Sequence, residues 1–168
     1  RLAVYVDTLS PRDRMVLTNE AGDLVPVECH DRLRVAPDSK SLVCVETTSH
    51  WLQSEDENTI SVSRIDLRGM TSSRSALTLP PNTLPRSFFP HFVGFLGDGT
   101  PVLTVHVNAE LETGGFGVQK MCAAFALRSA SVELLLSVVT ASWPDCDDAG
   151  FWNHSTKLEL VAGDELTF

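Results

Sequence analysis

The sequence predicts an all-β protein: a two-sheet sandwich with Greek-key or jelly-roll-like connections, in a single domain over residues 1–168. Three observations predict this fold class. Short segments rich in Val, Leu and Ile recur about every 8–12 residues, which is the strand spacing of sandwiches and barrels. Turn-forming Gly, Asp, Asn and Pro separate these segments, and counting them gives roughly nine to eleven strands. No internal repeat indicates a solenoid or a propeller.

The first part of the chain is a series of expected strands joined by tight turns. Ala21-Gly22-Asp23 predicts a hairpin turn, and Pro26 in the strand after it favours an edge position, because proline has no N–H for the ladder. A phase slip at Ser63-Arg64 predicts a β-bulge. The expected strands cover residues 1–6, 14–19, a short segment from 24, 31–36, 41–47 and 59–69.

A proline-rich stretch follows, in which Pro80, Pro81, Pro85 and Pro90 exclude a regular helix. We expect a long connection over about 71–91. Strand signals return after it, with an Asp-Gly hairpin turn at residues 97–99. In the strand that follows, alternation with its valine neighbours places His106 on the opposite face from them.

Residues 121–141 fit either an amphipathic helix or two strands. Apolar residues recur at spacings of three and four, as in a helix, but the run 131–140 also fits a buried strand. Because the rest of the chain is strand-rich, we favour two strands with a turn at 128–131. A last strand pair, KLELV and ELTF, is expected around a turn at 162–164.

Composition limits the class of partner. The 168 residues are 43% hydrophobic and 21% charged, as in a globular protein with a substantial core. The net charge of −9 repels phosphate backbones, so we expect no nucleic-acid partner. No run approaches the about 20 consecutive apolar residues of a membrane helix, so we expect no membrane insertion.

The four cysteines, Cys29, Cys44, Cys122 and Cys146, match no zinc-binding spacing. Cys44 and Cys122 stand in apolar runs, where a free thiol behaves as a small hydrophobic side chain. We therefore favour free buried cysteines over disulfides, with a disulfide framework as the alternative.

Tests for catalysis and for metal binding give no match. No histidine pair has zinc-protease spacing, and no Gly-x-Ser-x-Gly nucleophile motif occurs. Asp145, Asp147 and Asp148 fit a calcium loop only in part, since Ala149 and Thr156 occupy ligand positions. We interpret these aspartates as a solvated acidic turn. The sequence predicts no catalytic residues, no metal site and no cofactor.

The least ordinary stretch is SWPDCDDAGFWNHST, residues 142–156. Its Pro, Asp and Gly residues predict a long turn. In an extended backbone only one of two adjacent aromatic residues can face the core, so the other would be exposed to anchor a partner; the alternative is that neighbouring loops bury both. The stretch also holds a glycosylation sequon beginning at Asn153. The predicted binding residues are Trp143, Phe151, Trp152, His154, His50 and Trp51.

Two segments carry resemblances to known families. Residues 147–166 resemble the first motif of dUTP pyrophosphatases, an Asp-Ala-Gly-aromatic stretch before a strand, and residues 93–108 are similar to that family's uracil-binding hairpin. The family's Asp-Tyr-Arg-Gly segment is missing, its Arg-Ser-Gly motif matches loosely at residues 74–76, and the motif order is inverted. The resemblance implies an alternative function, a degenerate nucleotide-binding β-protein. Residues 156–168 look like a strand pair of tumour-necrosis-factor-type jelly rolls.

Together these observations predict a non-catalytic recognition or assembly module. It would bind a protein or glycan receptor through its loops, as an extracellular binding domain or as the protruding, receptor-contact domain of a viral coat. An extracellular or virion-surface location is favoured over the cytoplasm. Apolar edge strands or a sheet face would also support a homo-oligomer.

Overall fold

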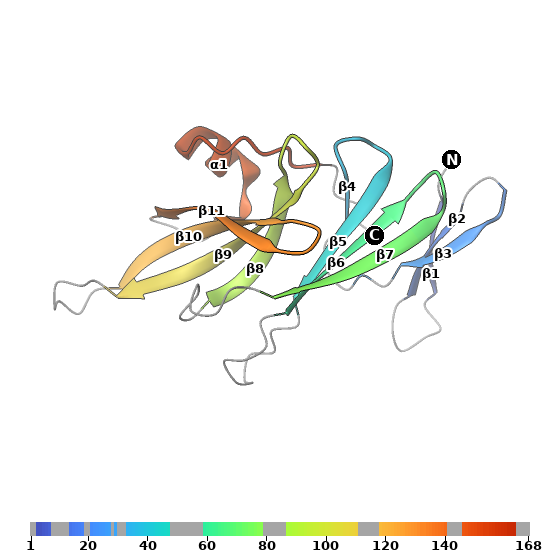
Figure 1. The fold of residues 1–168 in the computed structure, drawn as a ribbon, viewed down its shortest axis with the longest axis horizontal. Coiled ribbons are helices and arrows are strands. Elements are labelled where there is room, and N and C mark those ends of the chain that lie inside the picture. The colour runs from blue at the N-terminus through green and yellow to red at the C-terminus, as the bar shows by residue number, and fades with distance from the viewer. Residues whose placement is uncertain are drawn as a thin grey trace.

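Antiparallel strands build most of the described part of the chain (Figure 1). The computed structural model describes residues 3–7, 14–18, 21–27, 29, 33–47, 59–78, 87–110, 118–140 and 146–163. The strands in these residues are β1 (Ala3–Asp7), β2 (Arg14–Thr18), β3 (Leu24–Val27), β4 (Leu33–Val35), β5 (Ser41–Thr47), β6 (Thr59–Asp66), β7 (Thr71–Thr78), β8 (Ser87–Phe95), β9 (Pro101–Glu110), β10 (Val118–Leu127) and β11 (Val132–Val139). One short helix, α1 (Ala149–Ser155), follows them. No helix in the described residues has the length and apolar character needed to cross a membrane.

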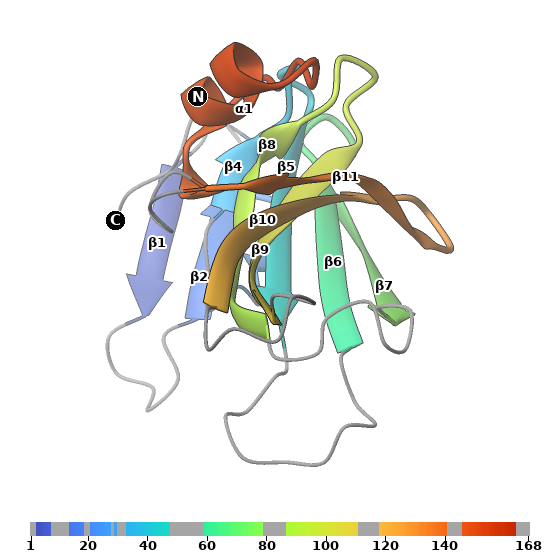
Figure 2. The same ribbon diagram turned by 90° about the vertical axis from the view of Figure 1, so that its left-hand side faces the viewer.

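Two four-stranded antiparallel sheets pack against each other, and this confirms the predicted all-β two-sheet sandwich. One sheet has the order β4-β5-β6-β7, and the other has the order β11-β10-β9-β8 (Figure 2). Paired strands are also sequence neighbours, so each sheet is a meander, which differs from the Greek-key or jelly-roll order expected. A three-stranded sheet, β1-β2-β3, lies on the far side of the β4–β7 sheet (Figure 1).

The inner core fills the space between the two four-stranded sheets. Alternate residues of their strands point into it, because successive side chains of a strand face opposite ways. Phe92 and Phe95 meet edge to face there, with ring centroids 5.2 Å apart. The buried side chains of the inner core are Ala36, Val43, Val45, Ile60, Leu77, Phe92, Phe95, Leu103, Val105, Ala123, Phe125 and Leu127.

The β4–β7 sheet is also buried on its other face, where Ile65 packs with Val27 and Cys29. This arrangement corrects the predicted bulge at residues 63–64, because β6 pairs with β5 and β7 without any register shift. The slip in the apolar pattern marks instead a change of core along β6. Ile60 packs in the inner core, whereas Ile65 packs in the cluster on the other face of the sheet. Pro26 does lie on an edge strand, as predicted, since β3 is the last strand of its sheet.

The proline-rich connection is shorter than the predicted 71–91. Residues 71–78 form β7 and residues 87–91 belong to β8, and the rest of the predicted connection, residues 79–86, lies outside the described residues. Pro90 sits inside β8 next to a register shift between Phe88 and Pro90. Proline is tolerated there because β8 is an edge strand and the bulge removes a ladder position.

Two predicted hairpin turns are confirmed. The turn at 21–23 joins β2 to β3, and the turn at 97–99 joins β8 to β9. The ambiguous segment 121–141 forms two strands, β10 and β11, with Arg128 donating its backbone N–H to the carbonyl of Ser131 across the turn.

All four cysteines form disulfides, which corrects the expectation of free thiols. Cys29 bonds to Cys44 and Cys122 bonds to Cys146, with Cα atoms 6.0 Å and 5.6 Å apart. Both separations fall in the usual range for a disulfide. Cys44 and Cys122 are buried in apolar strands as expected, but the folding of the chain brings a second cysteine against each. Each bond is expected to stabilise the fold by about 2–4 kcal/mol.

Residues 157–161 form no strand, so the first member of the predicted last strand pair is wrong, and the second member, residues 165–168, lies outside the described part of the chain. Val161 makes an isolated antiparallel bridge to Phe95 at the edge of β8. The backbone of Phe95 exchanges hydrogen bonds of 2.8 and 2.9 Å with Val161. Gly94 lets this contact form, because a Cβ atom at that position would lie 2.6 Å from the carbonyl oxygen of Val161.

We therefore predict that Gly94→Ala lowers the free energy of unfolding by about 2 kcal/mol or more, through this overlap and through its φ of +155°. Gly97→Ala is the matched control, since a Cβ atom there would meet nothing within 4 Å. Urea unfolding monitored by circular dichroism measures both. Equal stabilities for the two variants would contradict the close approach of Val161 to β8.

Candidate functional site

The outer face of the β8–β11 sheet is covered by the segment 146–160, which includes α1. The covered face is apolar, and its buried members from the strands are Val93, Val102, Cys122 and Ala124. Cys146, Trp152 and Leu160 close over them from the covering segment. We call this cluster the outer core. Residues 146–156 of the stretch that the sequence singled out therefore contribute most of the layer that covers this face.

The helix α1 begins where the sequence places an acidic turn. Asp148 is the N-cap residue, and its side chain accepts a hydrogen bond of 2.8 Å from the backbone N–H of Gly150. An aspartate at this position satisfies one of the N–H groups that a helix leaves open at its start. The prediction of a long turn is thus wrong for residues 149–155, and the adjacent aromatic residues sit on a helix instead of an extended chain.

Trp152 is completely buried, at 0% exposure, which contradicts its predicted role as a contact residue. Its indole Nε1–H donates a hydrogen bond of 2.9 Å to the backbone carbonyl of Cys146. A buried indole needs such an acceptor, and here the helix supplies it from its own leading segment. Phe151 stays half-buried, with its ring edge-to-face against Trp152 at 5.5 Å between centroids.

Asn153, the first residue of the sequon, ties the end of α1 to the segment that follows. Its side-chain amide donates to the carbonyl oxygen of Leu160 at 2.9 Å, and its carbonyl oxygen accepts from the N–H of Leu160 at 2.6 Å. The residue therefore has a structural role in the fold. His154, next to it, is exposed on the outer surface of α1.

Of the six predicted binding residues, the structure describes three. Phe151 and His154 lie on α1 and reach the surface in part or fully, whereas Trp152 belongs to the outer core. Trp143, His50 and Trp51 lie outside the described residues.

A polar cluster of two histidines and one aspartate borders the outer core. The Nε2 atom of His106 lies 3.1 Å from Oδ1 of Asp147, and Nε2 of His91 lies 3.5 Å from the other carboxylate oxygen. The two imidazole rings stack with centroids 5.8 Å apart. The side chain of His106 is 8% exposed, while those of His91 and Asp147 are 28% and 26% exposed. The cluster is thus partly exposed to solvent.

Neighbouring elements fix the three members of this cluster. His91 and His106 come from the paired strands β8 and β9, on the outer face of the sheet, as the alternation predicted for His106. Asp147 follows Cys146, whose disulfide to Cys122 attaches it to β10. A carboxylate only accepts hydrogen bonds, so the Nε2 atom of His106 carries the hydrogen in this contact.

The chemistry available to this cluster is reversible proton uptake. The sulfur atoms of Cys122 and Cys146 are joined in a disulfide, so neither can serve as a thiolate nucleophile. In the part of the chain that the structure describes, no group of three or more His, Cys, Asp or Glu side chains is arranged to hold a metal ion, this cluster included. The sequence did not indicate the cluster, because His106 and Asp147 stand 41 residues apart.

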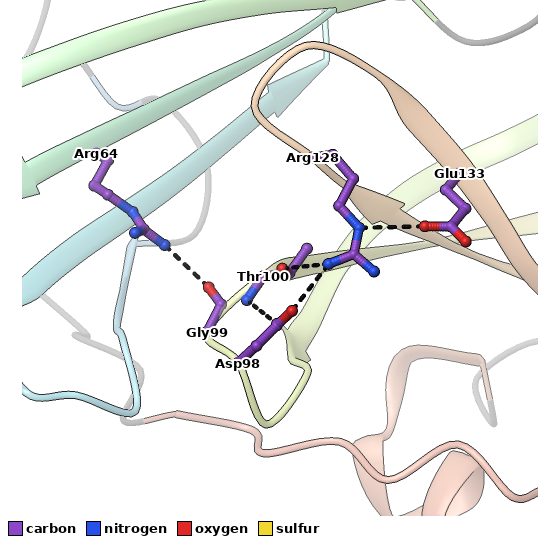
Figure 3. A network of polar contacts seen from close by, with 6 residues as sticks. All are labelled: Arg64, Asp98, Gly99, Thr100, Arg128 and Glu133. Atoms are coloured by element: carbon purple, nitrogen blue, oxygen red, sulfur yellow. Dashed lines mark hydrogen bonds and ion pairs between the residues drawn. The ribbon is translucent and has the colours of Figure 1, made fainter.

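A second polar network ties three hairpins together (Figure 3). Arg128 contacts Asp98 at 3.0 Å, Thr100 at 2.9 Å and Glu133 at 3.2 Å. Arg64, on the other four-stranded sheet, donates to the carbonyl of Gly99 at 3.0 Å. Hydrogen bonds from Thr100 and Arg128 lower the pKa of Asp98, and those to Glu133 and Asp98 raise the pKa of Arg128. The network is exposed, which indicates a positioning role more than a reactive one.

Comparison of the chain with known protein families, with curated proteins and with solved structures finds no significant match. The segments that resemble dUTP pyrophosphatases lie on different elements. Residues 93–108 do form a hairpin, β8–β9, but Arg74 lies in β7 and pairs with Glu46 at 3.1 Å. Residues 149–151, in the other segment, begin α1 on the outer core.

We predict that Trp152→Ala lowers the free energy of unfolding by about 3–5 kcal/mol, because it removes the largest side chain of the outer core. His154→Ala on the same helix should change it by less than about 0.5 kcal/mol, since that side chain is exposed. Denaturant unfolding with the disulfides intact measures both. A loss below about 1 kcal/mol for Trp152→Ala would contradict the burial of the indole.

Asp98 should contribute to the acid sensitivity of the fold. Its folded-state pKa is lowered, so its contribution is present above the unfolded-state pKa and is lost as the pH falls through the folded one. Asp98→Asn should therefore be less stable than the wild type at neutral pH, and the gap should close below about pH 4. Thermal unfolding from pH 7 to pH 2.5 follows this gap. A gap that keeps its size over the whole range would count against the Arg128 network.

Proposed function

We propose that this protein is a non-catalytic recognition module that binds a protein or glycan partner through the outer surface of α1 and the loops beside it. One observation carries the proposal: α1 displays side chains on a segment that is fixed at both ends. Cys146 attaches the start of the segment to β10 through a disulfide, and Val161 attaches its end to β8 through backbone hydrogen bonds.

A fixed segment suits recognition because little conformational entropy is lost when a partner binds. The buried indole of Trp152 and the paired hydrogen bonds between Asn153 and Leu160 fix the position of the helix. Phe151 and His154 then offer an aromatic ring and a polar imidazole on a surface of defined shape. Aromatic side chains in such positions supply much of the binding energy at protein and sugar interfaces.

The two disulfides support an oxidising environment for this function. Structural disulfides persist in extracellular, periplasmic and virion-surface proteins and are rare in a reducing cytosol. An extracellular binding domain or a receptor-contact domain of a viral coat fits that environment. Leu134 and Val139 on the edge strand β11 are 48% and 58% exposed, which supports a homo-oligomer as a further part of the proposal.

The alternative, a degenerate nucleotide-binding protein of the dUTP pyrophosphatase type, stays a weaker proposal. Arg74, the counterpart of that family's phosphate-binding arginine, is engaged by Glu46 in the β4–β7 sheet. Release of pyrophosphate from dUTP in the presence of magnesium would favour this alternative and contradict a non-catalytic module.

We predict that Phe151→Ala and His154→Ala each weaken partner binding by about tenfold while the melting temperature changes little. Glycan arrays and cell-surface binding assays with the wild-type protein identify the partner. Surface plasmon resonance then compares the affinities of the wild type and the variants for that partner. Arg68→Ala, an exposed change between β6 and β7 on the other sheet, is the control and should bind as the wild type does. Unchanged affinity in both α1 variants would remove this surface from the proposal.

A further inference from the structure

We propose that His91, His106 and Asp147 form a proton-dependent clamp that holds the leading segment of α1 more tightly in mildly acidic conditions. This inference concerns the regulation of the α1 surface and so rests on the proposed function, although its test needs no partner. The clamp is defined by the two contacts of 3.1 Å and 3.5 Å between the imidazole Nε2 atoms and the two oxygens of one carboxylate.

The charge on the imidazoles sets the strength of these contacts. When both rings are neutral, the Nε2–H of His106 already donates to a charged carboxylate, and Nε2 of His91 lies 3.5 Å from the other carboxylate oxygen. A proton taken up by either ring adds the attraction between two opposite charges to its contact with Asp147. Histidine is the side chain whose ordinary titration range lies between about pH 5 and 8.

Burial strengthens the effect of protonation on the contact between His106 and Asp147. The side chain of His106 is 8% exposed, so water screens its contact with Asp147 far less than it screens a surface pair. The net charge of −9 also favours proton uptake across the whole molecule. The added attraction exists only while an imidazole is protonated and the carboxylate of Asp147 is ionised.

The other charged groups near the cluster are few in the described residues. Asp148, next to Asp147, directs its carboxylate to the N–H of Gly150. Lys120 lies on β10 two positions from Cys122, and so on the same face of the sheet. The cysteines beside the cluster are in a disulfide and do not titrate. His154 is exposed on the outer surface of α1.

The clamp acts on a segment that is otherwise held by packing. Cys146 is fixed by its disulfide, and Asp147 is the next residue, directly before the N-cap of α1. Tightening at Asp147 therefore limits the fraying of the helix start, on which Phe151 is displayed. Mild acid should order the proposed binding surface, and neutral to alkaline pH should loosen it.

Hydrogen exchange read by mass spectrometry tests the clamp on the intact, disulfide-bonded protein. Rates are corrected for the intrinsic effect of pH, and peptides of β5 and β6, on the other four-stranded sheet, serve as the internal reference. Between pH 8 and pH 5.5, the relative protection of residues 149–156 should rise by about threefold to tenfold in the wild type. Constant or falling protection would overturn the proposal.

Variants assign the effect to the cluster. His91→Gln should reduce the rise, and Asp147→Asn should abolish it. His154→Gln removes a histidine from α1 outside the cluster and should keep the full rise. A rise that survives Asp147→Asn, or one that His154→Gln removes, would overturn the assignment. If Asp147→Asn perturbs folding, His91→Gln, at a more exposed position, decides the question alone.

The outcome separates this inference from the proposed function. If the protection of residues 149–156 stays constant with pH and Phe151→Ala weakens partner binding, the clamp is rejected and the α1 surface remains the proposed binding site. A pH-dependent rise together with unchanged partner binding by Phe151→Ala would keep the clamp and reject the surface as the binding site.

Discussion

The need to cover the outer face of the β8–β11 sheet is the constraint on which the rest of this structure depends. That face carries apolar side chains such as Val102 and Ala124, and an apolar sheet face must pack against another layer. The segment 146–163 supplies the layer. Its disulfide to β10, its buried Trp152 and its bridge to β8 all serve the same purpose, and the surface of α1 is a consequence of that packing.

Local patterns in the sequence were enough to predict the fold class, because strands and hairpin turns are encoded by nearest neighbours. The layers beyond the sandwich also leave a signal in the sequence. Residues 42–45 and 122–127 are continuous apolar runs, and a strand buried on both faces loses its alternation. In β6 the same effect produces a phase slip in the apolar pattern, which resembles that of a bulge. Unbroken apolar strands in an antiparallel protein therefore indicate additional layers.

The candidate site was less predictable, because it is made of long-range contacts. Phe151 and His154 reach the surface, and their predicted role in binding stays a prediction, whereas Trp152 belongs to the core. An Asp-Ala-Gly start after a second aspartate is a helix N-cap signal that places the indole on the inner side of α1. The pairing of His91 and His106 with Asp147 depends on the register of β8 with β9 and on a disulfide. Neither is visible from spacing alone.

The disulfide from Cys146 to Cys122 anchors the covering segment to β10, and peptide mapping under non-reducing conditions tests this anchor. The protein is alkylated before digestion, so that free thiols are labelled and disulfide-linked peptides are identified by mass. The structure predicts linked peptides that join Cys122 to Cys146 and Cys29 to Cys44. A different pairing, or an alkylated Cys146 in the folded protein, would contradict the account.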